Sequence, residues 1–185
     1  MRKGGSRLNR LVYERFGSRS GFVLFLGYWF LANIGGFRQF PPVRPQQNQR
    51  LVFVCNGNIC RSPLAEVYAR SLGREAASCG LNCGDGNPAD PRAKDFAKQY
   101  QLDLEHHRTT NAKSFSFRPD DLVVVMEPSH IASFQRIVGD HHHIVLAGSF
   151  CQRPRPYIHD PYNCCTGFFE NCERQVLEAV RGVCA

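Results

Sequence analysis

The chain has 185 residues, 43% of them apolar and 21% charged, a composition typical of a globular protein with one compact domain and an additional segment. Its net charge of +7 comes from residues 1–50, where nine Lys and Arg and one acidic residue sum to +8. Residues 51–185 carry 14 basic and 15 acidic residues, or −1. The larger part of the chain therefore lacks a basic surface, and we expect no nucleic-acid partner.

The nine cysteines are an odd number with irregular spacing, which is not typical of a secreted disulfide framework. No Cys-x-x-Cys pair occurs in the sequence, so a zinc ribbon is not indicated and we expect no metal site. Most of the cysteines are expected to be small buried side chains in a reducing compartment. This usage predicts a cytoplasmic protein.

Residues 1–50 are expected to form a unit separate from a domain that spans 51–185. Residues 2–19 are basic, residues 21–37 carry no formal charge, and a linker rich in Pro, Gln and Asn follows. The apolar run is at the lower limit for crossing a bilayer. We expect it to form a basic, apolar helix that attaches the protein to the inner face of the membrane. A helix packed on the domain, a membrane span and a cleaved signal peptide are the alternatives.

From residue 51 onward, apolar runs alternate with helical patterns. Short apolar runs predict buried strands at 51–54, 76–79, 122–126 and 144–147. Helices are predicted at 62–72, 90–100, 128–138 and 168–181. In the first helix, Ser62 is expected to be the N-cap and Pro63 the first helical residue. Strands that alternate with helices indicate an α/β fold, with a parallel sheet covered by helices on both faces.

The segment 54–63, VCNGNICRSP, joins the first strand to the first helix, where ligands bind in open α/β sheets. A helix N-terminus offers unpaired N–H groups, and a short loop whose amides turn inward forms an anion-binding nest. Gly57 and Asn58 suit the left-handed backbone that such a nest requires. We therefore expect this loop to bind the phosphate of a substrate through Asn56, Gly57, Asn58, Ile59, Cys60 and Ser62.

Two side chains of this segment are candidates for catalysis. Cys55 lies at the start of the loop, where the helix dipole and Arg61 favour its thiolate form. Arg61 can hold two phosphate oxygens with its planar guanidinium, and Ser62 can hydrogen-bond the sulfur. A thiolate that faces a bound phosphate can attack phosphorus and form a phosphocysteine. The loop and Arg61 neutralise the phosphate in this scheme, so we expect no cofactor.

The string VCNGNICRSP resembles the signature of the low-molecular-weight protein tyrosine phosphatases. The similarity continues in family order over about 51–182, through the segments 78–81, 88–93, 121–127 and 160–162. It implies a four-stranded parallel sheet, no cofactor and the same roles for Cys55 and Arg61. The resemblance also implies that Asp160 is the general acid, which later activates water, and that Tyr162 lines the mouth of the site.

The resemblance is closest to the bacterial branch that acts on tyrosine kinases of capsule and exopolysaccharide export, which implies a phosphotyrosine-bearing protein partner. Ile59 stands where related arginine phosphatases carry Thr, which favours tyrosine. Gly84 stands where many members carry Trp, which leaves the wall of the site open, and Asn163 replaces a second aromatic residue. The family also implies a reversible disulfide between Cys55 and Cys60 that protects the nucleophile from overoxidation.

Two other functions fit parts of the sequence. An arsenate reductase shares this fold and loop, and Cys79 and Cys83 would be its relay cysteines. The motif Asp160-Pro161-Tyr162 favours acid-assisted ester cleavage over that reading. An inactive phosphotyrosine-binding module would not need Cys55, Arg61 and Asp160 together, so the sequence favours the phosphatase.

Overall fold

A computed structural model describes residues 7–38, 40–155 and 157–185. Its centre is a four-stranded sheet whose strands are β1 (Leu51–Cys55), β2 (Ala76–Gly80), β3 (Leu122–Val125) and β4 (His143–Leu146). The strands are parallel and lie in the order β2-β1-β3-β4. The α/β fold and the parallel sheet predicted from the sequence are confirmed.

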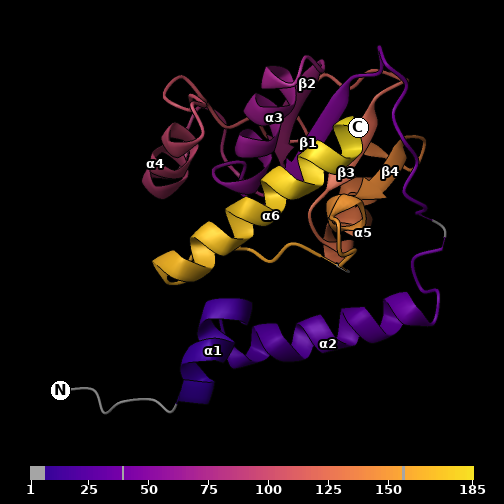
Figure 1. Cartoon of the computed structure of the whole chain (residues 1–185). Coiled ribbons are helices and arrows are strands. Elements are labelled where there is room, and N and C mark those ends of the chain that lie inside the picture. The colour runs from indigo at the N-terminus through magenta and orange to yellow at the C-terminus, as the bar shows by residue number, and fades with distance from the viewer. Residues whose placement is uncertain (1–6, 39, 156) are drawn as a thin grey trace.

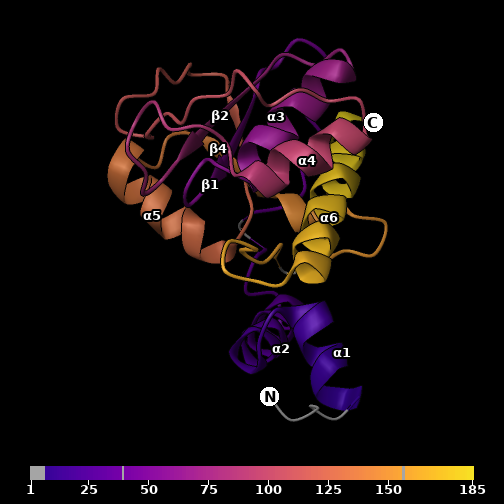
Figure 2. The same ribbon diagram turned by 90° about the vertical axis from the view of Figure 1, so that its left-hand side faces the viewer.

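Helices cover both faces of the sheet. Three of them, α3 (Arg61–Ser71), α4 (Pro91–Gln99) and α6 (Thr166–Cys184), lie on one face, and α5 (Pro128–Val138) lies on the other, as Figure 2 shows. Alternate residues of β1 point into two separate cores. Leu51 and Phe53 pack with α3, α4 and α6, while Val52 and Val54 pack with α5. Because both faces are buried, the strands are apolar throughout rather than alternating. A short 3-10 helix, η1 (Ala147–Phe150), follows β4.

The start of α3 differs from the prediction. The helix begins at Arg61, and Cys60 occupies the N-cap position without a side-chain cap hydrogen bond. The expectation that Ser62 caps the helix is therefore wrong, because Ser62 already lies in the first turn and its hydroxyl faces Cys55. The start predicted for the next helix is confirmed, since α4 begins at Pro91 and its N-cap, Asp90, accepts a hydrogen bond from the Arg92 amide at 2.8 Å.

The N-terminal arm, residues 7–38, forms two helices below the sheet domain in Figure 1: α1 (Arg7–Phe16) and α2 (Arg19–Asn33). Gly17 separates them with a φ of +71°, and a Cβ there would lie 2.8 Å from Phe168 of α6. Glycine is needed at this position because of both the left-handed backbone and the close approach. The arm therefore lies directly against the C-terminal helix.

One side of α2 packs on the domain and the other does not. Tyr157 donates a hydrogen bond to the Gly21 carbonyl at 3.1 Å, and the rings of Phe25 and Tyr28 pack against the Tyr157 ring. The opposite side exposes large apolar side chains, among them Val23 (68%), Phe30 (60%) and Ile34 (60%). In the part of the chain that the structure describes, no helix is both long enough and apolar enough to cross a membrane.

Candidate active site

The loop between β1 and α3 is shaped by Asn58, which is fully buried and has a left-handed φ of 52°. Its side-chain amide donates to the hydroxyls of Ser62 and Ser78 at 2.9 Å each, and its side-chain oxygen accepts from the Thr110 amide. The ring Nε2 of His107 donates to its carbonyl at 2.7 Å. Four residues from three segments of the chain therefore hold Asn58, which stabilises an otherwise unfavourable backbone conformation.

Cys55 lies at the carboxyl end of β1, inside the curve of the loop. Its Sγ is 3.0 Å from the Ser62 hydroxyl and accepts a hydrogen bond from the Asn58 amide at 3.3 Å. Ser62 Oγ accepts a hydrogen bond from the Asn58 side chain, and its own proton can be donated to the sulfur or, over 3.5 Å, to the Cys79 carbonyl. Two hydrogen-bonding groups of the loop and of α3 therefore face the sulfur of Cys55.

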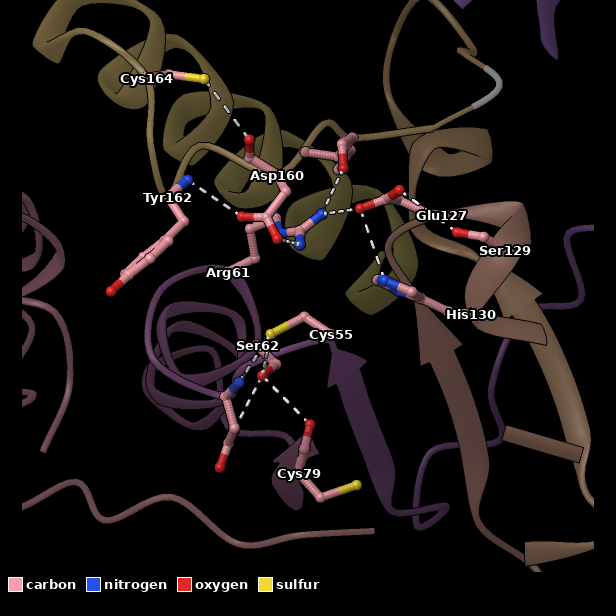
Figure 3. A network of polar contacts seen from close by, with 12 residues as sticks. Cys55, Arg61, Ser62, Cys79, Glu127, Ser129, His130, Asp160, Tyr162 and Cys164 are labelled. Atoms are coloured by element: carbon pink, nitrogen blue, oxygen red, sulfur yellow. Dashed lines mark hydrogen bonds and ion pairs between the residues drawn. The ribbon is translucent and has the colours of Figure 1, made fainter. Parts of the chain in front are cut away.

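Arg61 is almost completely buried and binds three groups beside the loop (Figure 3). Its Nη1 donates to Glu127 Oε1 at 2.6 Å and to the Ile158 carbonyl at 2.9 Å, while Nη2 pairs with Asp160 Oδ2 at 2.9 Å. Burial acts to lower the pKa of Arg61, but the charges of Asp160 and Glu127 outweigh it and the pKa is raised. The guanidinium is therefore permanently charged and fixed in orientation.

Asp160 and Tyr162 form the opposite side of the site. Asp160 is 40% exposed, and its Oδ1 accepts a hydrogen bond from the Tyr162 amide at 3.1 Å. Tyr162 is 51% exposed, and its ring points away from Arg61 in Figure 3. A carboxyl group with access to solvent, next to the guanidinium, can exchange protons with a bound ligand and with water.

These residues surround a cavity of about 450 Å³, within the usual range for a small ligand. The sequence-predicted residues that line it are Cys55, Asn56, Gly57, Ile59, Cys60, Arg61, Asp160 and Tyr162. Asn58 and Ser62 lie behind the loop rather than in the cavity, where they support the loop and the sulfur. The facing wall includes Cys83 and Gly84, so it carries no bulky aromatic side chain at that position.

Sequence reasoning missed the role of Glu127, which anchors the guanidinium of Arg61. The available signal was its position directly after the apolar run of β3, since polar residues at strand ends meet at the edge that carries the site. His130 Nε2 lies 3.6 Å from the same carboxylate. Burial, followed by the charge of Arg61, lowers the pKa of His130 to about 4. His130 is thus neutral at pH 7, and Arg61 is the charged partner of Glu127.

A second missed group is Glu173 of α6. It is fully buried, and neither of its carboxylate oxygens has a hydrogen-bond partner among the described residues. Burial raises the pKa of Glu173 to about 8, although the nearby charge of Arg61 acts in the opposite direction. The side chain is therefore mostly a neutral acid at pH 7.

The remaining cysteines show no metal-binding arrangement. Within residues 7–38, 40–155 and 157–185, no group of three His, Cys, Asp or Glu side chains could hold a metal ion. Cys60 is buried next to the loop, and burial raises the pKa of its thiol far above the usual range. Cys60 is therefore a protonated thiol at pH 7, unlike the nucleophile expected of Cys55.

The sequence profile of the family described as low molecular weight phosphotyrosine protein phosphatase matches residues 50–185. The chain is 33% identical over 123 residues to the low molecular weight protein-tyrosine-phosphatase Wzb of Salmonella typhi, which covers 65% of this chain and 82% of Wzb. The crystal structure of the Erwinia amylovora tyrosine phosphatase AmsI superposes with a TM-score of 0.65 at 29% identity, covering 74% of this chain and 91% of AmsI.

Vibrio vulnificus Wzb, solved in complex with benzylphosphonate, superposes with a TM-score of 0.61 at 28% identity, covering 72% of this chain and 94% of that protein. These similarities agree with the parallel sheet and with the loop that follows β1. Because the family profile extends over most of the sequence, the chain belongs to the low molecular weight phosphotyrosine protein phosphatase family, a family of hydrolases.

Proposed function

We propose that this protein hydrolyses phosphotyrosine in proteins, with Cys55 as nucleophile, Arg61 as phosphate-binding residue and Asp160 as general acid. The observation that carries the proposal is the placement of the three groups around one cavity, with the Ser62 hydroxyl and the Asn58 amide directed at the sulfur. The loop amides between Cys55 and Arg61 bind the phosphate oxygens.

The reaction has two steps. The Cys55 thiolate attacks phosphorus and the bond to the tyrosine oxygen breaks, which leaves a phosphocysteine. The leaving phenolate is strongly basic, because tyrosine has a pKa near 10, so Asp160 donates a proton to it. The resulting carboxylate then takes a proton from a water molecule that attacks phosphocysteine, which releases phosphate and restores the thiolate.

The contacts of Arg61 indicate which part of its guanidinium is available to the phosphate of the substrate. Nη1 is held by Glu127 and the Ile158 carbonyl, whereas Nη2 contacts Asp160, which lines the cavity. A bound phosphate replaces the Asp160 carboxylate as the partner of Nη2. Release from this ion pair leaves the Asp160 carboxyl group free to face the leaving phenolate.

The substrate is a phosphotyrosine-bearing protein, and we propose a bacterial tyrosine kinase as the candidate. The relatives that support it are named as protein-tyrosine-phosphatases, and Vibrio vulnificus Wzb was solved with an aromatic phosphonate. In this chain, the Tyr162 ring can stack on the substrate phenol, and Gly84 leaves the facing wall open to a protein segment.

The test is turnover of a phosphotyrosine peptide by the full chain and by Cys55→Ser. The wild type should hydrolyse it, and the variant should show only background rates, because a serine hydroxyl is not ionised at neutral pH. Phosphoserine and phosphoarginine peptides, together with arsenate-dependent oxidation of thioredoxin, serve as comparisons. Activity of the serine variant, or preference for any comparison substrate, would contradict the proposal.

We also propose that residues 1–50 form a unit that holds the enzyme at the inner, cytoplasmic face of an anionic membrane. This unit carries a net charge of +8, and α2 presents Val23, Phe30 and Ile34 to the outside while its other side packs on Tyr157. An exposed apolar helix face combined with basic residues is what attachment to a lipid surface requires. Each basic residue near the surface contributes about 1 kcal/mol.

Co-sedimentation with vesicles rich in anionic lipid tests this attachment. We expect wild type to sediment, and Val23→Glu/Phe30→Glu to stay in the supernatant with unchanged activity on a small aryl phosphate. The matched control is Leu72→Glu, which places a charge at an exposed apolar residue of the domain (43% exposed). Equal sedimentation of the wild type and the double variant would show that the apolar face of α2 does not bind lipid.

A further inference from the structure

A second cavity, of about 570 Å³, lies between the N-terminal arm and the sheet domain. The arm contributes Arg15, Phe16 and Phe25 to its lining. The domain contributes the segment that precedes Asp160 and one side of α6. The volume is in the range of small-molecule sites, and none of these residues takes part in the proposed hydrolysis.

The lining of this cavity is strongly basic. Four arginines and one carboxylate give a formal charge of +4 − 1 = +3, from Arg15, Arg153, Arg155, Arg174 and Glu178. Glu178 accepts a hydrogen bond from the Gln152 amide, and Arg174 has a loose ion pair with Glu170 at 3.5 Å. No described residue forms an ion pair with Arg15, Arg153 or Arg155. Converging like charges repel one another, and a bound anion would relieve that repulsion.

Aromatic rings form the apolar part of the same cavity. The ring centroids of Phe16 and Phe25 are 5.3 Å apart, and those of Phe25 and Tyr157 are 6.4 Å apart. The series continues from Tyr157 to His159 at 5.7 Å and from His159 to Phe168 at 5.5 Å. The Nδ1 of His159 and the Nε of Arg155 are buried and have no hydrogen-bond partner among the described residues. Cationic and aromatic groups therefore face one shared space.

We propose that this cavity is a binding site for an organic phosphate, with the phosphate on the arginines and an aromatic or acyl body on the rings. Guanidinium groups bind phosphate through paired N–H donors, and rings contribute apolar contact area. The ligand would join Arg15 of the arm to Arg153 and Arg174 of the domain. It would thus fasten the arm to the domain, which goes beyond the proposed hydrolysis.

The site binds its ligand without hydrolysing it. The cysteine in its lining is Cys172, and burial raises the pKa of this thiol well above its usual range, so it is no thiolate at neutral pH. The segment 157–160 separates this cavity from the catalytic one. Tyr157 and His159 face the basic cavity, while the Ile158 carbonyl and Asp160 bind Arg61.

Calorimetric titration of the full chain with benzylphosphonate tests the proposal. A phosphonate has no ester bond, so the catalytic site cannot hydrolyse it during the titration. We expect two binding sites per chain in the wild type and one in Arg153→Ala/Arg174→Ala. The control Lys113→Ala/Arg136→Ala removes the same charge away from both cavities and should keep both sites. Arg153 and Arg174 are exposed, so their removal should leave the fold intact, which circular dichroism can verify.

One site in the wild type, or two sites in Arg153→Ala/Arg174→Ala, would overturn the proposal. The Arg61→Ala variant separates this result from the proposed catalysis, because it should lose hydrolysis and the catalytic site but keep the basic cavity. A short-chain phosphatidate identifies the source of the ligand. Binding tighter than that of benzylphosphonate by roughly tenfold or more assigns the cavity to a lipid headgroup, and equal or weaker binding assigns it to a soluble organic phosphate.

Discussion

The phosphate-binding loop and the N-terminal arm are held in place by different kinds of contact. Asn58 and Arg61 are buried, and each has hydrogen bonds to at least three groups from distant segments. The contacts of α2 with the domain are mostly between rings, with one hydrogen bond from Tyr157. Buried polar networks define one arrangement of atoms, whereas apolar contacts tolerate small shifts. The loop should therefore be sensitive to conservative substitutions that the arm tolerates.

The largest expected effect is that of Arg61→Lys. An ammonium group keeps the charge but lacks the planar set of N–H donors with which a guanidinium binds Glu127, the Ile158 carbonyl and a phosphate at the same time. We expect the rate of phosphotyrosine hydrolysis to fall by roughly 10³–10⁵-fold, as for other arginines that stabilise a phosphoryl transition state. Steady-state kinetics on a phosphotyrosine peptide measures this. A loss below tenfold would mean that charge alone is sufficient at this position.

Asp160→Asn should have the next largest effect. The amide cannot protonate the leaving phenolate, so hydrolysis of phosphotyrosine should slow by roughly 10²–10⁴-fold. The loss should shrink for aryl phosphates with acidic phenols, which leave without a proton. A series of aryl phosphates of graded phenol pKa measures this dependence. The same loss for every leaving group would assign Asp160 to the orientation of Arg61 instead.

Glu173→Gln tests the buried carboxyl group through the pH dependence of stability. Since burial raises the folded-state pKa of Glu173 to about 8, the folded protein retains a proton that the unfolded chain loses near pH 4.5. Stability of the wild type should therefore fall by about 1.4 kcal/mol per pH unit between about pH 5 and pH 8 from this group.

Glutamine does not titrate, so the free energy of unfolding of the variant should match that of the wild type near pH 5. At pH 8.5 the variant should be more stable by a few kcal/mol, because the wild type has then lost the stability that accumulates between the two pKa values of Glu173. Urea denaturation at a series of pH values measures the difference. Parallel curves for the two proteins would show that Glu173 remains ionised in the fold.

The smallest effect is expected for Tyr157→Phe in the contact between arm and domain. The substitution keeps the ring contacts and removes the hydrogen bond to Gly21, which is worth about 1 kcal/mol. Hydrogen exchange of the α2 amides should become faster by roughly fivefold, while hydrolysis of a small aryl phosphate should not change. A substantial change in hydrolysis would show that the arm and the catalytic site are coupled through segment 157–160.

The sequence was most informative where structure is local. The strand, the loop and the helix that carry Cys55 and Arg61 are consecutive, so their residues alone indicate an anion-binding nest. The Ser62 cap was wrong because the helix begins two residues earlier than the Ser-Pro pattern suggests, with Cys60 as N-cap and Arg61 as the first helical residue. The pairing of Arg61 with Glu127 and with the Ile158 carbonyl was not predicted, because these groups lie 66 and 97 residues away in the chain.

The same limit applies to the arm. Its composition predicted an apolar helix, but the contact between Tyr157 and Gly21 joins residues 136 positions apart. Composition also does not indicate which side of α2 faces the domain. The two unpartnered carboxylate oxygens of Glu173 depend on the packing of α6 against the sheet, and its sequence context is that of an ordinary helix position.

The packing of α1 against α6 in Figure 1 has a consequence for the order of folding. Helix α1 begins at Arg7 and α6 ends at Cys184, so the arm is synthesised first and its docking surface last. A contact of such sequence separation forms late, because most of the chain must be ordered before it can be made. During synthesis on the ribosome the arm therefore emerges long before its docking surface on α6, and the membrane attachment proposed above would be able to form before the arm docks on the domain.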